Sequence, residues 1–326
     1  MSELRLSSDE LAFLRYTCNI FFLPESPLSV FEAEKREPKS FASTHDVLVK
    51  KGLVDPHTWM GKETALQGVQ VVAECDARVL WQRYDRDGKH TRDFYVMGGL
   101  SVEFNSGDAR VTRDADGNLS RDDQTYLFGE PRREQAVVDE VIGQFSPAPK
   151  GRTLVNQVFS PGEYLVFAVF ARDVRSQPPE SSQDNMTLEE VMAFFEDEPS
   201  TVPKDSDFEK HAHTLTDRGV LTKDAKGNYA LHVSLHGFAR GLSSDKYDAF
   251  TRYDFIDDEW LIRETTVYPV PSSVFLLSSL ADGSVSVQEL DADELYEVVA
   301  QAIATLPDVS DDPAKPRQAR DFFLRG

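Results

Sequence analysis

Three short segments of this 326-residue chain recur, in the same order, in its second half. LSSDELAFL (residues 6–14) is echoed by FSPGEYLVF (159–167), VLVKKGLV (47–54) by TLTDRGVL (214–221), and WQRYD (81–85) by FTRYD (250–254). Each half then closes with a helix-like stretch, at residues 134–145 and 293–306. Internal repeats decide architecture before any single residue does. We therefore predict an internally duplicated chain, with one half at residues 1–149 and the other at 150–306, the second carrying an insertion near 181–207.

Apolar residues at helical spacing predict the helices that open each half. In the first half, Ser8 fits an N-cap, and Gly52 suits the left-handed position after a helix. Thr187 and Glu190 form a capping-box pattern in the second half. The predicted helices are at residues 8–21, 29–35, 44–51 and 62–75, and then at 162–174, 188–196 and 209–217.

Apolar alternation with a period of two predicts a run of antiparallel strands in each half. Turn dipeptides separate the first-half strands at Asp87-Gly88, Ser106-Gly107 and Asp116-Gly117. The predicted strands are at residues 78–84, 91–97, 100–104 and 109–113, and at 249–255, 259–268, 273–279 and 284–290. A small hairpin at 221–231 should turn at Lys226-Gly227. The predicted fold class is α+β, with each half composed of N-terminal helices, an antiparallel β-meander and a closing helix.

The chain is acidic, with a net charge of −21, of which −15 falls in residues 151–326. The negative electrostatic field of such a chain repels the phosphate groups of nucleic acids and anionic membranes. We therefore predict neither a nucleic-acid partner nor a membrane partner. No apolar run approaches the roughly 20 residues that span a bilayer, and the first residues lack the pattern of a secretory signal. These features predict a cytoplasmic protein. Cys18 and Cys75 lie in apolar contexts and should be two buried reduced thiols.

The sequence carries no recognisable catalytic motif, whether a glycine-rich phosphate loop, His-Glu-x-x-His, Gly-x-Ser-x-Gly or Cys-x-x-Cys. Residues 114–118 resemble part of a calcium loop, but their composition fits a tight hairpin turn. Four histidines have metal-like spacing, yet no cysteine lies near them and no motif places a carboxylate beside them: His211, His213, His232 and His236. We therefore predict no catalytic residue, no metal and no cofactor.

Two further patterns leave alternatives open. Residues 215–221 and the hairpin after them resemble the third helix and wing of winged-helix proteins, so a regulatory protein of that kind is an alternative, as is an enzyme without a recognisable motif. Arg83 and Arg252 belong to the repeated Arg-Tyr-Asp. We expect them to alternate outward from strands whose Tyr84 and Tyr253 point inward. Alternatively, they pair with neighbouring acids at a pseudo-twofold interface.

The order of elements, together with Leu-x-x-Lys-Gly-Leu at residues 48–53 and Leu-x-x-Arg-Gly-Val at 215–220, resembles the ESX secretion-associated EspG family. The resemblance covers residues 5–306, and the chain departs from the family in its acidity, its insertion and its tail. It implies two related halves, a central sheet with helical bundles, and a role as a cytosolic chaperone that keeps paired helical export substrates soluble. The expected function is therefore that of a non-enzymatic adaptor or chaperone for a protein partner, and no partner-contacting residue is carried over from the family.

Residues 307–326 form a proline-containing tail that is acidic in its first part, residues 307–316, and in which Phe322, Phe323 and Leu324 lie between two arginines. Leaving these apolar side chains in water would forgo burial worth roughly 1.5 to 3 kcal/mol each. We expect them to dock on the chain's own acidic body, with a protein partner or a second copy of the chain as the alternative. They are the partner-binding candidates of the sequence.

Overall fold

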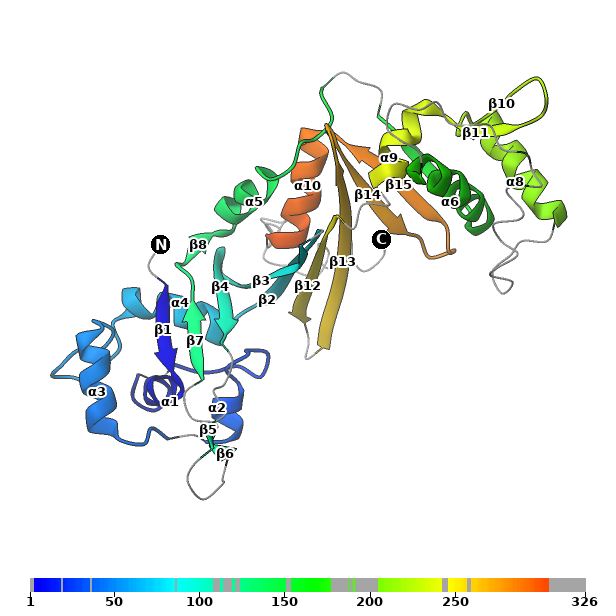
Figure 1. The fold of residues 1–326 in the computed structure, drawn as a ribbon. Coiled ribbons are helices and arrows are strands. Elements are labelled where there is room, and N and C mark those ends of the chain that lie inside the picture. The colour runs from blue at the N-terminus through cyan, green and yellow to red at the C-terminus, as the bar shows by residue number, and fades with distance from the viewer. Residues whose placement is uncertain are drawn as a thin grey trace, which may run out of the picture.

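The computed structural model describes residues 3–18, 20–35, 37–85, 87–107, 112–113, 119–120, 124–150, 154–176, 187, 190, 205–241, 246–256 and 259–304. The fold is α+β, as predicted, and centres on one large antiparallel sheet that runs through both halves of the chain (Figure 1). In the described part of the chain, no helix is long and apolar enough to cross a membrane.

The eleven strands of this sheet follow the order β1-β7-β4-β3-β2-β12-β13-β14-β15-β9, and β8 pairs with β4 beside that path. Their bounds are β1 (Leu4–Ser7), β2 (Ala77–Asp85), β3 (Gly88–Met97), β4 (Leu100–Ser106), β7 (Thr125–Phe128), β8 (Arg132–Arg133), β9 (Asn156–Phe159), β12 (Tyr247–Ile256), β13 (Glu259–Val270), β14 (Ser273–Ser279) and β15 (Val285–Leu290). A separate two-stranded ribbon consists of β5 (Thr112–Arg113) and β6 (Leu119–Ser120).

The strand order reads the same way outward from the central β2–β12 pair. β3 and β13 come next, then β4 and β14, β7 and β15, and finally β1 and β9 at the two ends. In the central pair, Trp81 lies opposite Phe250, and their rings stack with centroids 6.0 Å apart. The two segments that share the Arg-Tyr-Asp pattern are therefore hydrogen-bonded neighbours at the middle of the sheet.

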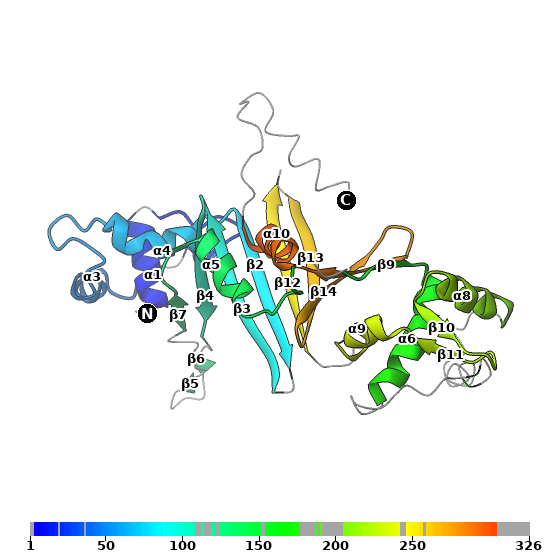
Figure 2. The same cartoon turned by 90° about the horizontal axis from the view of Figure 1, so that it is seen from above.

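Two helices cover one face of the central strands, α5 (Glu134–Ile142) and α10 (Ala292–Ile303), as Figure 2 shows. Beneath them lies an apolar core that includes Val79, Trp81, Phe94, Phe250 and Leu295. Asp291 and Glu294 form a capping box at the start of α10, satisfying backbone N–H groups that have no partner within the helix. We call this side of the sheet the covered face.

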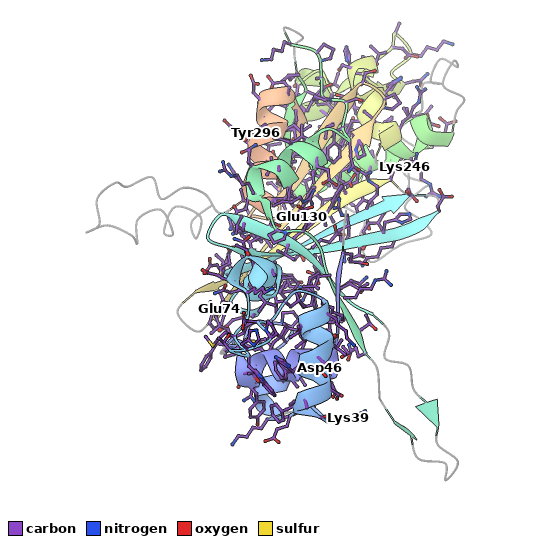
Figure 3. The ribbon with its side chains drawn as sticks, turned by 90° about the vertical axis from the view of Figure 1, so that its left-hand side faces the viewer. Lys39, Asp46, Glu74, Glu130, Lys246 and Tyr296 are labelled. Carbon is purple, nitrogen blue, oxygen red and sulfur yellow. The ribbon has the colours of Figure 1, made fainter. Side chains whose placement is uncertain are left out.

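The remaining helices form two lobes at opposite ends of the sheet (Figures 1 and 2). The first lobe contains α1 (Ser8–Thr17), α2 (Val30–Ala33), α3 (Phe41–Lys50) and α4 (Glu63–Ala73). The second lobe contains α6 (Pro161–Ser176), α8 (Asp205–Asp217), the hairpin of β10 (Leu221–Lys223) and β11 (Tyr229–Leu231), the 3-10 turn η1 (Val233–Leu235) and α9 (His236–Gly241). Each lobe has its own apolar core. In the side view of Figure 3, Lys39 and Asp46 mark the first lobe, away from Lys246 and Tyr296.

Most of the predicted helices and strands are present, with shifts of a few residues at their ends. Gly52 and Gly227 have the positive φ values, 76° and 89°, that their positions require. The cap of α1 is Ser7 rather than Ser8, because the Ser7 side chain and Glu10 exchange the two bonds of a capping box. The sequence also missed β1, β7 and β9. Most of the strand predicted at 109–113 lies outside the described residues, and its described end, β5, belongs to the separate ribbon; after β4, the next strand of the large sheet along the chain is β7.

Several predictions fall on residues that the structure does not describe. These are the turn at 114–118, nearly all of the helix at 188–196, most of the insertion at 181–207 and the whole tail at 307–326. Thr187 and Glu190, which are described, do exchange the capping-box bonds, at 3.2 Å from the Glu190 amide and 2.8 Å from the Thr187 amide.

Candidate functional site

Among the residues that the structure describes, helices cover the central strands on one face only, where α5 and α10 lie. Successive side chains on a strand point to opposite faces, so alternate residues separate the two sides. On the covered face, Val79, Trp81 and Phe250 are buried. We call the other side the open face. Apart from Tyr95 of β3, which is only 2% exposed, its residues are partly or fully exposed: Arg78, Leu80, Gln82 and Tyr84 on β2; Lys89 and Thr91 on β3; Tyr247, Ala249, Thr251 and Tyr253 on β12; Ile262 and Glu264 on β13.

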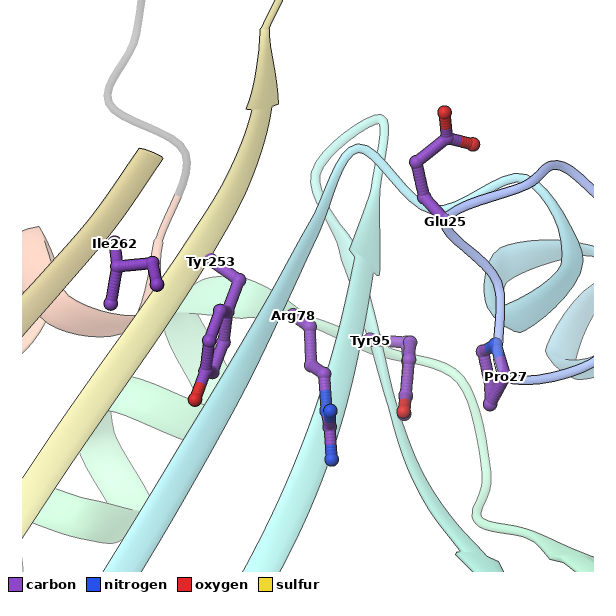
Figure 4. Close-up of a pocket in the computed structure, with 6 residues that line it drawn as sticks. All are labelled: Glu25, Pro27, Arg78, Tyr95, Tyr253 and Ile262. Carbon is purple, nitrogen blue, oxygen red and sulfur yellow. The ribbon is translucent and has the colours of Figure 1, made fainter. Parts of the chain in front are cut away.

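A pocket of about 320 Å³ lies on the open face where it meets the first lobe. Its floor comes from three neighbouring strands, which supply Tyr95, Arg78 and Tyr253 side by side (Figure 4). Ile262 forms one wall and is 55% exposed. The opposite wall is Pro27, with Glu25 nearby on the loop between α1 and α2. The pocket therefore combines apolar walls with a polar floor, which is typical of sites that bind one side chain or a small ligand.

Arg78 is fixed in the floor of this pocket by a bidentate ion pair. Its Nε and Nη2 donate to Asp93 at 2.9 and 2.8 Å, and its guanidinium lies 5.8 Å from the ring centre of Tyr95 and 5.7 Å from that of Tyr253. The bond to Asp93 raises the pKa of Arg78. On the other side of the pair, burial raises the pKa of Asp93 and Arg78 opposes that shift. The pair gives the floor a rigid, preorganised shape.

A second aromatic group lies on the open face toward the second lobe. Tyr84 and Tyr247 are cross-strand neighbours whose rings stack 4.3 Å apart at an angle of 15°. Tyr268 lies 5.9 Å from Tyr247, and the ammonium of Lys89 lies 5.3 Å from the centre of Tyr84. Arg78 and Tyr84 are six residues apart on β2, so the two groups are separated by roughly 20 Å. The open face thus presents aromatic side chains near both lobes.

The expected orientation of the repeated arginines is wrong. Arg252 is only 3% exposed and lies on the covered face, where its Nη1 donates to the carbonyl oxygen of Ile303 at 2.7 Å and its Nε to Asp254 at 2.8 Å. Arg83 is partly exposed on the same face and donates to Asp248 across the central pair at 2.9 Å. The alternative, pairing with acids at the interface between the halves, describes both arginines better, because each satisfies a carboxylate there.

Three of the four histidines singled out by spacing have local structural contacts, and the fourth, His213, is exposed on α8. His232 caps η1, with Nδ1 accepting from the Ser234 amide, and His236 Nε2 bonds to the carbonyl oxygen of Leu231 at 3.0 Å. His211 packs closely on Gly162 of α6, where a Cβ atom would clash with its ring. Within the described ranges, no group of three or more His, Cys, Asp or Glu side chains could hold a metal ion.

Both cysteines are free thiols, although only one of them is buried. Burial raises the pKa of Cys75 to about 12. Cys18 is half-buried, contrary to the prediction, but desolvation still raises its pKa to about 11. Neither thiol is therefore activated as a nucleophile at neutral pH.

Sequence reasoning did not single out Arg78, Tyr95 or Ile262. Alternation along β2 does predict that Arg78, Leu80, Gln82 and Tyr84 share one face. It does not reveal that the helices cover the other face, because α5 and α10 both pack on the same side. The tail residues Phe322, Phe323 and Leu324 lie outside the described residues.

Comparison with solved structures gives a structural likeness, whereas comparison with family models and curated sequences gives none. The chain matches no family model, and no curated protein matches it in sequence. Its structure is similar to that of the Mycobacterium tuberculosis type VII secretion system chaperone EspG5, solved in complex with the PE25–PPE41 dimer. The TM-score is 0.46 with 11% sequence identity, and the match covers 94% of this chain and 97% of the other.

Proposed function

We propose that the protein is a non-enzymatic adaptor or chaperone of the cytosol, which holds a protein partner on the open face. The single observation that carries this proposal is the open face itself, a strip of half-exposed and exposed side chains between two helical lobes. The sequence resemblance to the EspG family supports the same role and suggests a secretion substrate as the partner.

The composition of the open face supports protein recognition. Tyrosine and arginine are enriched among the residues that dominate binding energy at protein interfaces, because they combine a large apolar area with polar groups. Here Arg78, Tyr253, Tyr84 and Tyr247 lie along the central pair of strands, and Ile262 adds an exposed apolar side chain. β2 lies between β3 and β12, and β12 lies between β2 and β13, so neither central strand has a free edge. The partner would therefore contact side chains rather than add a strand to the sheet.

The test is recovery of a partner from the native host with a tagged chain and two matched variants. Ile262→Arg places a charge on the open face, and Leu280→Arg makes the same change at another exposed apolar residue, 43% exposed in the turn between β14 and β15. We expect the unchanged chain and Leu280→Arg to recover the same partner in stoichiometric amounts. Ile262→Arg should weaken the complex about tenfold or more, which corresponds to about 1.4 kcal/mol.

Two results would contradict the proposal. One is the absence of any stoichiometric protein partner for the unchanged chain. The other is a partner that Ile262→Arg and Leu280→Arg retain equally, because such a partner would bind away from the open face. Thermal unfolding of all three proteins checks that both substitutions leave the fold intact.

We also infer that residues 1–149 and 150–306 are two copies of one ancestral unit. The observations that support this are the three repeated segments, the strand order that reads alike outward from β2 and β12, and the placement of Trp81 opposite Phe250. Duplication would explain why each lobe is followed by strands that pair in the same order outward from the centre of the sheet, and then by a closing helix.

A further inference from the structure

We propose that residues 320–325 of the same chain, Arg-Asp-Phe-Phe-Leu-Arg, dock in the pocket of the open face. The segment would place Phe322, Phe323 or Leu324 between Ile262, Tyr253 and Pro27. The docking concerns the chain alone. That a partner on the open face would have to displace the tail rests on the proposed function.

The described part of the chain ends directly behind this pocket. The carbonyl oxygen of Ile303, in the last turn of α10, accepts a 2.7 Å hydrogen bond from Arg252. Tyr253, the next residue of β12, lies opposite Arg78 and lines the pocket on the other face. The last described residue, Ala304, is thus separated from the pocket by about the thickness of one sheet.

The tail is long enough to pass around the sheet. Strand β12 ends at Ile256, three residues beyond Tyr253, so the end of the strand lies roughly 10 Å from the pocket. An extended chain advances about 3.3 to 3.6 Å per residue, so the 18 residues from Ala304 to Phe322 can span roughly 60 Å. The path over the β12–β13 end and back along the open face needs only part of that length.

The chemistry of the segment matches the pocket. Its three apolar side chains meet apolar walls at Ile262 and Pro27, and aromatic side chains can pack on the rings of Tyr95 and Tyr253. The segment has an arginine on each side, at 320 and 325. Glu25, a lining residue, has a buried Oε2 without a hydrogen-bond partner in the described part of the chain, and Glu264 is exposed two residues from Ile262 on the same face.

An unpartnered carboxylate oxygen next to an apolar pocket favours a ligand that brings a cation as well as an apolar group. The tail provides both on one short segment, and its attachment to α10 makes the binding intramolecular at a high effective concentration. A partner protein on the open face would have to displace the tail.

The test is disulfide trapping in the full-length chain at low concentration. The background is Cys18→Ser, because Cys18 is half-buried and Cys75 is buried. One protein carries Ile262→Cys with Leu324→Cys, and its matched control carries Met60→Cys with Leu324→Cys. Met60 is 59% exposed and Ile262 55%, so the two acceptor thiols are similarly exposed to solvent.

We expect the Ile262→Cys pair to form an intramolecular disulfide about tenfold faster or more than the Met60→Cys pair. Adding Phe322→Ser and Phe323→Ser should remove that difference. Equal rates, faster trapping at Met60→Cys, or a disulfide that joins two chains would each overturn the proposal. Since trapping needs no partner, it can succeed even if the open face binds no other protein, and the two proposals fail separately.

Discussion

Asp248 is the most deeply buried carboxylate at the junction of the two halves. It is 1% exposed on the covered face, where it accepts from Trp81 Nε1 at 2.8 Å and from Arg83 Nε at 2.9 Å. Burial raises the pKa of Asp248 above its ordinary value of 3.8, although Trp81 and Arg83 oppose the shift. Desolvation thus outweighs the two hydrogen bonds, and the charged form is less stable in the folded protein than in the unfolded chain.

This shift predicts a pH dependence with a defined sign. A folded-state pKa above the unfolded value means that the folded protein binds the proton more tightly, so Asp248 contributes stability that is present at low pH and lost as pH rises through its folded pKa. We expect the free energy of unfolding of the unchanged protein, relative to Asp248→Asn, to increase as pH falls from 7 toward 4. Urea unfolding of both proteins across that range measures the difference. A difference that stays constant or decreases would contradict this assignment.

At the scale of elements, α10 depends on its first residues. The Asp291 side chain accepts from the amides of Asp293 and Glu294, both at 2.9 Å, and the Asp291 amide donates to Glu294 Oε2 at 3.1 Å. Helix α10 is also the larger part of the cover over the central strands, since Leu295, Val299 and Ile303 are buried there. The cap therefore stabilises an element on which the central core depends.

We predict that Asp291→Ala lowers the free energy of unfolding by about 1 kcal/mol, the usual cost of losing an N-cap. Asp293→Ala is the matched control. Asp293 lies two residues away and is 78% exposed, and its pair with Lys150 is equally exposed, so its loss should cost no more than about 0.5 kcal/mol. Chemical denaturation of the two variants gives the comparison. Equal losses would show that the capping bonds of Asp291 are not important for stability.

Local signals predicted most elements but not all of their arrangement. Gly52 and the Lys226-Gly227 turn could be predicted because each requires a backbone conformation that glycine adopts easily. The end strands β1 and β9 were missed because each has only four residues and runs directly into a helix. The open face was also missed. Its residues come from β3, β2, β12 and β13, and no local pattern indicates that strands so far apart in sequence become neighbours.

The burial of Arg252 is a second feature that the local sequence could not predict. The alternation along β12 correctly placed Arg252 and Tyr253 on opposite faces. Because tyrosine is the more hydrophobic residue, the pattern favoured Tyr253 as the core residue, and this was wrong. Arg252 is buried instead, because the carbonyl oxygen of Ile303 and the carboxylate of Asp254 accept hydrogen bonds from its guanidinium. Such compensation depends on a helix end that the sequence of the strand cannot reveal.

At the scale of the whole molecule, the two halves share one sheet rather than touching as separate bodies. β2 and β12 are paired over eight residues, from Tyr84 opposite Tyr247 to Ala77 opposite Asp254. The core under α5 and α10 takes side chains from both halves. Each half alone would leave a long strand with an unpaired edge and a core open on one side.

We therefore predict that residues 1–149 expressed alone do not form a stable monomer. The exposed edge of β2 should drive association, either with a second copy or into larger aggregates, whereas co-expression with residues 150–326 should give a 1:1 complex. Light scattering during gel filtration distinguishes these states, with the intact chain as the reference. A folded, monomeric fragment of residues 1–149 would contradict this prediction.

The pairing of β2 with β12 also has a consequence in time. On a ribosome, β2 emerges well before its partner, since Phe250 is translated only after the 168 residues that follow Trp81. At about 5 to 20 residues per second, this delay is roughly 10 to 30 seconds. During that interval the first lobe can fold around its local contacts, while the edge of β2 stays available to any other strand nearby. Synthesis of this chain should therefore be most sensitive to chaperone supply in the period before β12 is made.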